Sequence, residues 1–222
     1  MTAYGLHRYE RSAPMPRHRH AQAYMAIVVT GGYLEAGDTG RFEARPGDVI
    51  LHGAFEAHQD MFEANGATVL NLPLGPESRS GAGRIEDADA LVRLAERDPF
   101  EASLQAQSEL AIGSPALSDW PDQLADALRK DPDLPIAQWA RDMGIAPASV
   151  SRGFSRAYGV CPKRFRLEMR TLNAVRQLDR WKGSLAALAA EHGFADQAHF
   201  TRSAVALIGT PPSIFRIAGR QG

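Results

Sequence analysis

The sequence of 222 residues contains a single cysteine, Cys161. One cysteine excludes an intramolecular disulfide framework and any thiolate-rich metal site within the chain. Long hydrophobic runs are also missing, and none approaches the roughly 18–20 residues that a membrane-spanning helix needs. Residues 1–10 lack a basic segment leading into an apolar stretch, so no secretion signal is visible. We therefore expect a cytoplasmic protein that does not bind a membrane.

The residue patterns of common catalytic sites are absent as well. The sequence shows no Ser/His/Asp arrangement that would activate a nucleophile, no glycine-rich phosphate loop and no paired carboxylates. Its composition is that of a soluble globular protein, with 44% hydrophobic and 23% charged residues. We expect a protein that is not an enzyme. Its length favours two domains, because one domain typically takes roughly 100–150 residues.

Opposite charges dominate the two halves of the chain, although the net charge is only −1. Residues 1–118 hold 10 arginines against 16 acidic residues, and residues 119–222 hold 15 basic against 10 acidic residues. The basic excess is concentrated at Arg152, Arg156, Lys163, Arg164, Arg166, Arg170, Arg176, Arg180 and Lys182. Such a segment suits contact with the phosphates of nucleic acid, because lysine and arginine release condensed counterions. A solvated helix surface can also be basic, so charge alone leaves both alternatives open.

The first 84 residues predict short β-strands separated by turn residues. The expected strands cover residues 24–30, 41–44, 48–52 and 67–72, and Gly31 with Gly32 is expected to end the first of them. Such a series predicts an antiparallel β-barrel or sandwich. Helical spacing follows from residue 85 to 110, and glycine, serine and proline at 112–117 predict a linker.

Two similar pairs of helices are predicted after residue 119. In the first pair, apolar residues recur at helical spacing over 136–143, a turn covers 144–146, and a second helix begins at Pro147. The order recurs from Leu185, with a turn at 192–194 and a second helix capped by Asp196. On both second helices the positions opposite the apolar face are small, polar or cationic.

A long basic helix, expected from Pro162 to Trp181, joins the two pairs, and the whole segment resembles the DNA-binding domain of the AraC/XylS family. The stretches that carry the resemblance are 136–144, 149–156, 159–162, 193–202, 209–212 and 215–216. The resemblance implies that both second helices enter successive major grooves of double-stranded DNA, about 34 Å apart. It implies as DNA-binding residues Ala148, Ser151, Arg152, Arg156, Gln197, Ala198, His199, Thr201 and Arg202.

The first half resembles the two motifs of the cupin barrel, at residues 16–31 and 40–58. Metal-binding cupins take two histidines and a glutamate from the first motif and a histidine from the second. Here Tyr24 stands at the glutamate position, and a phenol is a poor replacement for a carboxylate ligand. The trio His18, His20 and His58 would either hold Zn²⁺ with an open position or, together with Tyr24 and His52, line an effector pocket without metal.

Three functions fit these patterns. The first is a transcription regulator with a cupin-like sensor barrel over 1–84, a helical segment and linker over 85–118, and an AraC-type DNA-binding domain over 119–222. It would bind a small-molecule effector, form a homodimer and, as an activator, contact RNA polymerase. The alternative from another class is a cupin metalloenzyme with an appended helical domain, which needs a competent metal centre. In the third, the first half only oligomerises a DNA-binding protein. We expect the first.

Overall fold

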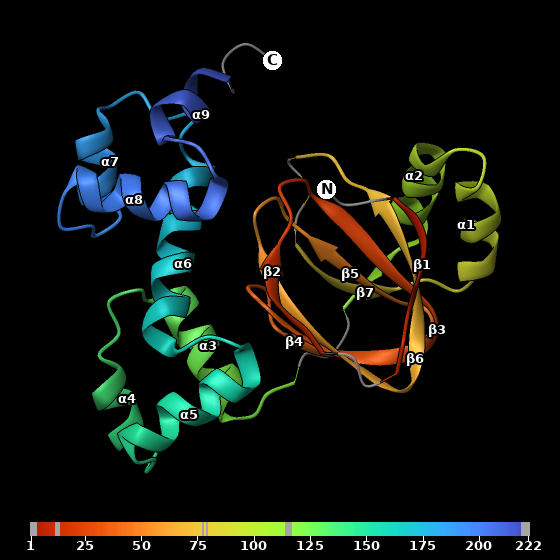
Figure 1. Ribbon diagram of the computed structural model, residues 1–222, viewed down its shortest axis with the longest axis horizontal. Helices are drawn as coiled ribbons and strands as arrows, with labels where there is room; N and C mark the ends of the chain where they lie inside the picture. The colour runs from red at the N-terminus through yellow and green to blue at the C-terminus, as the bar shows by residue number, and fades with distance from the viewer. Residues whose placement is uncertain (1–3, 12–13, 77, 79, 114–116, 219–222) are drawn as a thin grey trace. The chain divides into compact units, whose positions relative to one another are not determined.

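The computed structural model describes all residues except 1–3, 12–13, 77, 79, 114–116 and 219–222. The chain forms two compact units (Figure 1). One is rich in β-sheet and comprises Met1–Asp122 with Arg156–Gly159, and the other is helical and comprises Gln123–Ser155 with Val160–Gly222. Within the described residues, no helix has the length and apolar character needed to cross a membrane.

A single antiparallel sheet builds the first unit. Its strands, among the described residues, are β1 (Gly5–Tyr9), β2 (Pro14–Arg19), β3 (Tyr24–Gly37), β4 (Arg41–Ala44), β5 (Asp48–His52), β6 (Ala57–Pro73), β7 (Gly81–Arg84) and β8 (Ala111–Ile112). They follow the order β1-β6-β3-β5-β7-β8, with β2 added to β6 and β4 to β3. The expected closed barrel is therefore not present as such, because no pairing between described residues joins β1 to β8. Instead, β3 and β6 each pair with different neighbours along their length, in an open sheet.

The expected end of a strand at Gly31 and Gly32 is wrong, because β3 continues through both glycines to Gly37. The register between β3 and β6 shifts on either side of Gly31, where the strands bulge. Gly31 has φ +70°, and a Cβ atom built on it would lie 2.0 Å from the carbonyl oxygen of Gly66. The two glycines allow a close approach of the two backbones and do not interrupt the sheet.

Two helices cover one face of the sheet, as the helical spacing after residue 85 predicted. They are α1 (Ala88–Ala95), capped by Asp87, and α2 (Pro99–Glu109), capped by Asp98. Buried residues from both helices join the sheet in a single apolar cluster, which includes Leu91, Ala102 and Ala106. The linker predicted at 112–117 begins later than expected, because Ile112 belongs to β8 and pairs with Gly83 of β7. Residues 114–116 of this predicted linker lie outside the described residues.

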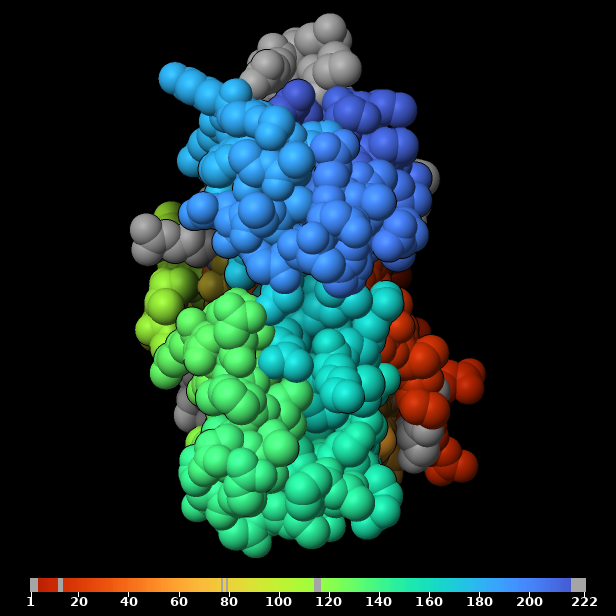
Figure 2. All heavy atoms as spheres, turned by 90° about the vertical axis from the view of Figure 1, so that its left-hand side faces the viewer, coloured from red at the N-terminus to blue at the C-terminus, as the bar shows by residue number. Residues whose placement is uncertain are grey.

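The second unit is helical. Among the described residues, the helices of this part of the chain are α3 (Trp120–Lys130), α4 (Ile136–Asp142), α5 (Pro147–Tyr158), α6 (Pro162–Arg176), α7 (Leu185–Glu191), α8 (Gln197–Ile208) and α9 (Pro212–Ala218). The start of α3, up to Asp122, and the end of α5, from Arg156, are grouped with the first unit. Figures 1 and 2 show α3, α4 and α5 grouped at one end of α6 and α7, α8 and α9 at the other. The expected helix to Trp181 ends earlier, at Arg176, because the backbone tightens into i→i+3 hydrogen bonds such as the one from Leu178 N–H to the Val175 carbonyl.

Helix α6 holds a separate apolar core at each end. At its first half, the rings of Phe154 and Phe165 are fully buried, with centroids 5.4 Å apart. At its second half, Val175 and other α6 residues pack with Phe194 and Phe200 in one cluster. The two helix groups are thus attached to one rigid element, and their separation follows from the length of α6.

Candidate functional site

The surface of α5 carries the first set of expected DNA-binding residues. Val150, Phe154 and Tyr158 are buried, and they fix which face of α5 points inward. On the other side, the expected residues Ala148, Ser151, Arg152 and Arg156 are all exposed. Because the apolar residues recur at helical spacing, the sequence alone determines this orientation.

The surface of α8 carries the second set. Phe200, Ala204 and Leu207 are buried, whereas the expected residues Gln197, Ala198 and Arg202 are exposed and His199 and Thr201 are half-buried. The predicted cap is confirmed: the Asp196 carboxylate accepts a hydrogen bond of 2.6 Å from the His199 N–H. At the other end, Gly209 adopts a left-handed conformation with φ +77° and ends the helix.

The basic residues of α6 divide into two kinds. Lys163 and Arg164 are exposed, and Arg164 pairs with Glu168 one turn along the helix. Arg166 donates to the Leu134 carbonyl, and Arg170 donates to the Gly193 carbonyl and to Asp133, at 2.6 and 2.7 Å. Part of the local positive charge therefore stabilises the fold, since Arg170 on α6 binds one loop of each helix group, at Asp133 and at Gly193.

In the first unit, the sheet face opposite α1 and α2 lines a cavity of about 310 Å³. Apolar and aromatic side chains form part of the wall, and polar side chains gather at one end. The lining consists of His7, Tyr9, Met15, His18, His20, Tyr24, Ala26, Tyr33, Glu35, His52, His58, Asp60, Phe62, Val69 and Asn71. A partly apolar cavity with a few convergent polar groups is the usual form of a small-molecule site.

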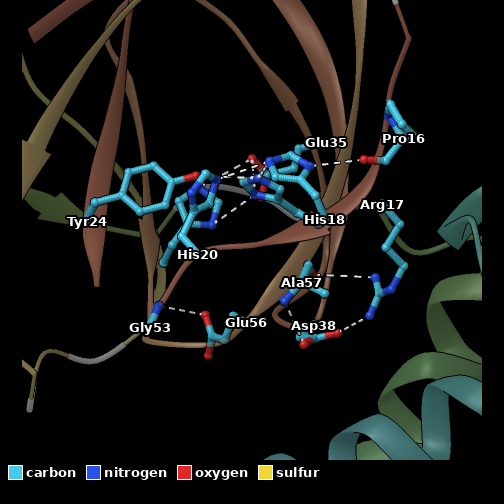
Figure 3. A network of polar contacts seen from close by, with 12 residues as sticks. Pro16, Arg17, His18, His20, Tyr24, Glu35, Asp38, Gly53, Glu56 and Ala57 are labelled. Atoms are coloured by element: carbon cyan, nitrogen blue, oxygen red, sulfur yellow. Dashed lines mark hydrogen bonds and ion pairs between the residues drawn. The ribbon is translucent and has the colours of Figure 1, made fainter. Parts of the chain in front are cut away.

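The five residues expected for an effector pocket all lie in this cavity, and strand pairing explains why. His18 on β2 is the register partner of His58 on β6, and Tyr24 on β3 is the partner of His52 on β5. Figure 3 shows the Tyr24 hydroxyl directed toward the group that contains His18 and His20. The Tyr24 ring also stacks on the His52 ring, with centroids 4.5 Å apart. Residues far apart in the sequence therefore meet at one end of the cavity.

The three histidines expected as zinc ligands come together in the structure. The Nε2 atom of His18 lies 2.9 Å from that of His58 and 3.1 Å from that of His20. The three residues can thus present nitrogen atoms to one ion. Their spacing is equally that of imidazoles hydrogen-bonded to one another, which needs no ion.

Two buried carboxylates that line the cavity were not among the residues predicted from the sequence motifs. Glu35 on β3 is the register partner of Asp60 on β6, and both are more than nine-tenths buried. The Glu35 Oε2 atom lies 3.6 Å from Nε2 of His52 and 3.8 Å from Nδ1 of His58. Only the period of two along β3, which places Glu35 on the same face as Tyr33, indicates from sequence that it points inward.

Burial determines the protonation states of this group. Desolvation, with smaller contributions from His20 and His18, lowers the pKa of His52 to about 3. Desolvation also raises the pKa of Glu35 well above its usual range, with the charges of Asp60 and Glu56 adding to the effect. In the absence of a cation, both shifts favour the uncharged forms of Glu35 and His52.

Comparison with known proteins supplies independent information on the helical unit. Residues 139–217 match a family model described as a helix-turn-helix domain. The virulence regulon transcriptional activator VirF of Yersinia enterocolitica and the thermoregulatory protein LcrF of Yersinia pestis are each 32% identical over 82 residues. The matched segment covers 37% of this chain and only 30% of each of these relatives.

Solved structures show more distant likenesses. ToxT from Vibrio cholerae with a bound unsaturated fatty acid is 10% identical with a TM-score of 0.44, covering 98% of this chain and 97% of that one. The C-terminal domain of AraT from Geobacillus stearothermophilus is 19% identical with a TM-score of 0.42, covering 46% of this chain and 87% of that one. Likenesses this distant carry no argument about a ligand or a mechanism.

The helical unit therefore defines a protein of the helix-turn-helix class, in which the second helix of a pair is the DNA-binding element. Residues 139–217 of the chain thus form a helix-turn-helix domain similar to those of these two regulatory proteins. The relatives that match this unit are described as a transcriptional activator and a thermoregulatory protein, so the alternative of a cupin metalloenzyme is not favoured.

Proposed function

We propose that this chain regulates transcription by reading DNA with α5 and α8, under the control of a small molecule bound in the cavity of the first unit. The observation that carries the proposal is the pair of outward faces on α5 and α8, both exposed, both polar or cationic, and both attached to α6. The division of labour follows the boundaries expected from the sequence, with 1–84 as sensor, 85–118 as helical segment and linker, and 119–222 as DNA-binding domain.

The exposed side chains have the chemistry for reading bases. Arg152 and Arg202 can each donate two hydrogen bonds to O6 and N7 of guanine, and Gln197 suits adenine. The methyl groups of Ala148, Ala198 and Thr201 can meet the methyl group of thymine. Lys163 and Arg164 are exposed at the start of α6, and they suit phosphate contacts, which set affinity without sequence preference.

We expect Arg202→Ala and Arg152→Ala each to remove about 1–3 kcal/mol of discrimination at one base position, because each loses a bidentate contact. The measurement is selection of binding sites from random DNA by the full chain, followed by titration of single-base variants of the selected site. Lys163→Ala is the matched control, since it should weaken all sequences equally and reduce the salt dependence. A uniform loss for both arginine variants would make them phosphate contacts instead.

The effector proposal rests on the cavity of about 310 Å³, whose end is formed by His18, His20, Tyr24, His52 and His58. Its walls supply apolar contact, and the imidazoles and the phenol supply donors and acceptors that orient a small polar ligand. A homodimer is supported by α2, where Phe100 and Leu104 lie one turn apart and are 65% and 69% exposed. As an activator the dimer would also contact RNA polymerase.

Removing residues 1–115 tests this division of labour. The remaining chain should keep the sequence preference of the full protein, because α5, α6 and α8 all lie beyond the cut. Its affinity should fall and its response to any effector should vanish, since linked binding events gain from effective concentration. Titrations of one selected site with both proteins, after circular dichroism has verified helical content, provide the measurement. A folded fragment without preference for the site over random DNA would contradict the assignment.

A further inference from the structure

A second trio of metal-ligand side chains lies beside the histidines already described, at the buried end of the same cavity. It consists of Glu35, His52 and His58, which offer one oxygen and two nitrogen atoms within 4.8 Å of one another. All three residues are more than nine-tenths buried. We propose that this trio binds a divalent transition-metal ion of the zinc class, and that His18 and His20 are not its ligands. The proposal does not rest on DNA binding.

The distances separate the two trios. Zinc binds imidazole nitrogen and carboxylate oxygen at about 2.0–2.2 Å, so two ligands of one tetrahedral ion lie about 3.3–3.6 Å apart. The Glu35 Oε2 atom lies 3.6 Å from the His52 nitrogen and 3.8 Å from the His58 nitrogen. These separations exceed a hydrogen bond and leave room for an ion. The contacts of 2.9 and 3.1 Å made by His18 are hydrogen-bond lengths and leave less room.

The hydrogen bonds of His18 also determine which nitrogen atoms of His58 and His52 carry protons. The Nδ1 atom of His18 lies 3.0 Å from the Pro16 carbonyl oxygen, which can only accept, so this nitrogen carries the proton. The Nε2 atom of His18 is then an acceptor, and Nε2 of His58, at 2.9 Å, donates to it. The Nδ1 atom of His58 is then the acceptor of a hydrogen bond of 3.2 Å from Nδ1 of His52, which leaves Nε2 of His52 with a lone pair 3.6 Å from Glu35.

Unsatisfied polar atoms mark the same place. Among the described side chains, Oε1 of Glu35 and Nε2 of His52 are buried without a hydrogen-bond partner, and so is Oδ1 of Asp60 nearby. A buried polar atom without a partner is costly and therefore rare in native proteins. An ion held by Oε2 of Glu35 and Nε2 of His52 would satisfy the His52 atom. It would also supply positive charge to a pair of buried carboxylates.

The donor set indicates what the ion is for. Two histidines and one carboxylate leave a fourth position open on zinc, and the trio lines the cavity from which a ligand would approach. An anionic or electron-donating group of a small molecule, such as a carboxylate, could occupy that position. The cavity would then recognise its effector partly through the ion, and His18 would act as a positioning residue for His58.

Metal binding by the full chain tests the proposal without DNA. The protein is stripped with a chelator and titrated with Zn²⁺ against a chromophoric zinc indicator. We expect one equivalent to bind, and Glu35→Gln and His52→Ala to weaken binding by at least about 100-fold, the upper range for lost supporting groups. His18→Ala should weaken it by about tenfold at most, through the orientation of His58. His20→Ala should bind like the wild type, as should His7→Ala, a control histidine from the same cavity.

Two results would overturn the proposal. One is the absence of stoichiometric zinc binding by the wild-type chain, which would assign the unsatisfied atoms to water or to the effector. The other is loss of binding in His20→Ala with binding retained in Glu35→Gln, which would place the ion on the three histidines. X-ray absorption at the zinc edge of the wild-type protein distinguishes two imidazoles with a carboxylate from three imidazoles, so the decision does not depend on folding of the variants. Either negative result leaves the DNA-reading proposal untouched.

Discussion

Replacing Gly31 by alanine is expected to lower the stability of the sheet-rich unit by about 3 kcal/mol or more. The added Cβ atom would lie 2.0 Å from the Gly66 carbonyl oxygen, which is backbone and cannot rotate away. The left-handed backbone at Gly31, with φ +70°, adds about 1–2 kcal/mol for any residue with a side chain. Forcing extra atoms into a packed region costs typically about 1–3 kcal/mol more.

Gly81→Ala is the matched control, because Gly81 also lies in a strand of this sheet but has open space within 4 Å of its Cβ position. Its effect on stability should stay within about 1 kcal/mol. Urea unfolding of both variants, followed by circular dichroism, measures the difference. Equal midpoints for the two variants would contradict the close approach of Gly31 and Gly66.

The adjacent glycines Gly31 and Gly32 illustrate how far the sequence predicts the sheet. A glycine pair within an apolar run indicates a turn or a bulge, and only the pairing partner decides between them. Here β6 lies alongside β3, and the bulge brings Gly66 against Gly31. Strand β2 was missed for a related reason, since Pro14 and Pro16 argue against a strand. Both prolines are tolerated because β2 pairs only with β6 and lies at an edge of the sheet.

The cavity was predictable in part. His18, His20 and His58 follow from motif spacing, and the structure brings them within 4.8 Å of one another. Glu35 belongs to neither motif, because its place beside His58 depends on the antiparallel register of β3 and β6. A one-dimensional pattern does not contain the register of distant strands, whereas the period of 3.6 residues in α5 and α8 is local. The outward faces of these helices were therefore easier to predict than the group around Glu35.

Replacing Phe200 by alanine is expected to destabilise the second helix group by about 3–5 kcal/mol, the range for truncating a buried phenylalanine. The Phe200 side chain is fully buried and lies in the cluster formed with α6 and α7. Its ring centroid is 5.2 Å from that of Phe194, so the substitution also removes an aromatic contact. The cavity left behind would lie directly beneath the helix that presents Arg202.

Specific DNA binding by the Phe200→Ala variant should also fall, and by more than the loss expected for Arg202→Ala. The reason is that every expected reading residue of α8 depends on the packing of Phe200. Val205→Ala, on the same helix with a side chain 37% exposed, is the control and should change stability by less than about 1 kcal/mol. Thermal unfolding of the two variants gives the stability, and titration of a selected site below both transitions gives the affinity. If Phe200→Ala lost stability as expected but kept full preference for the selected site, α8 would not be a reading helix, and recognition would reside in α5 alone.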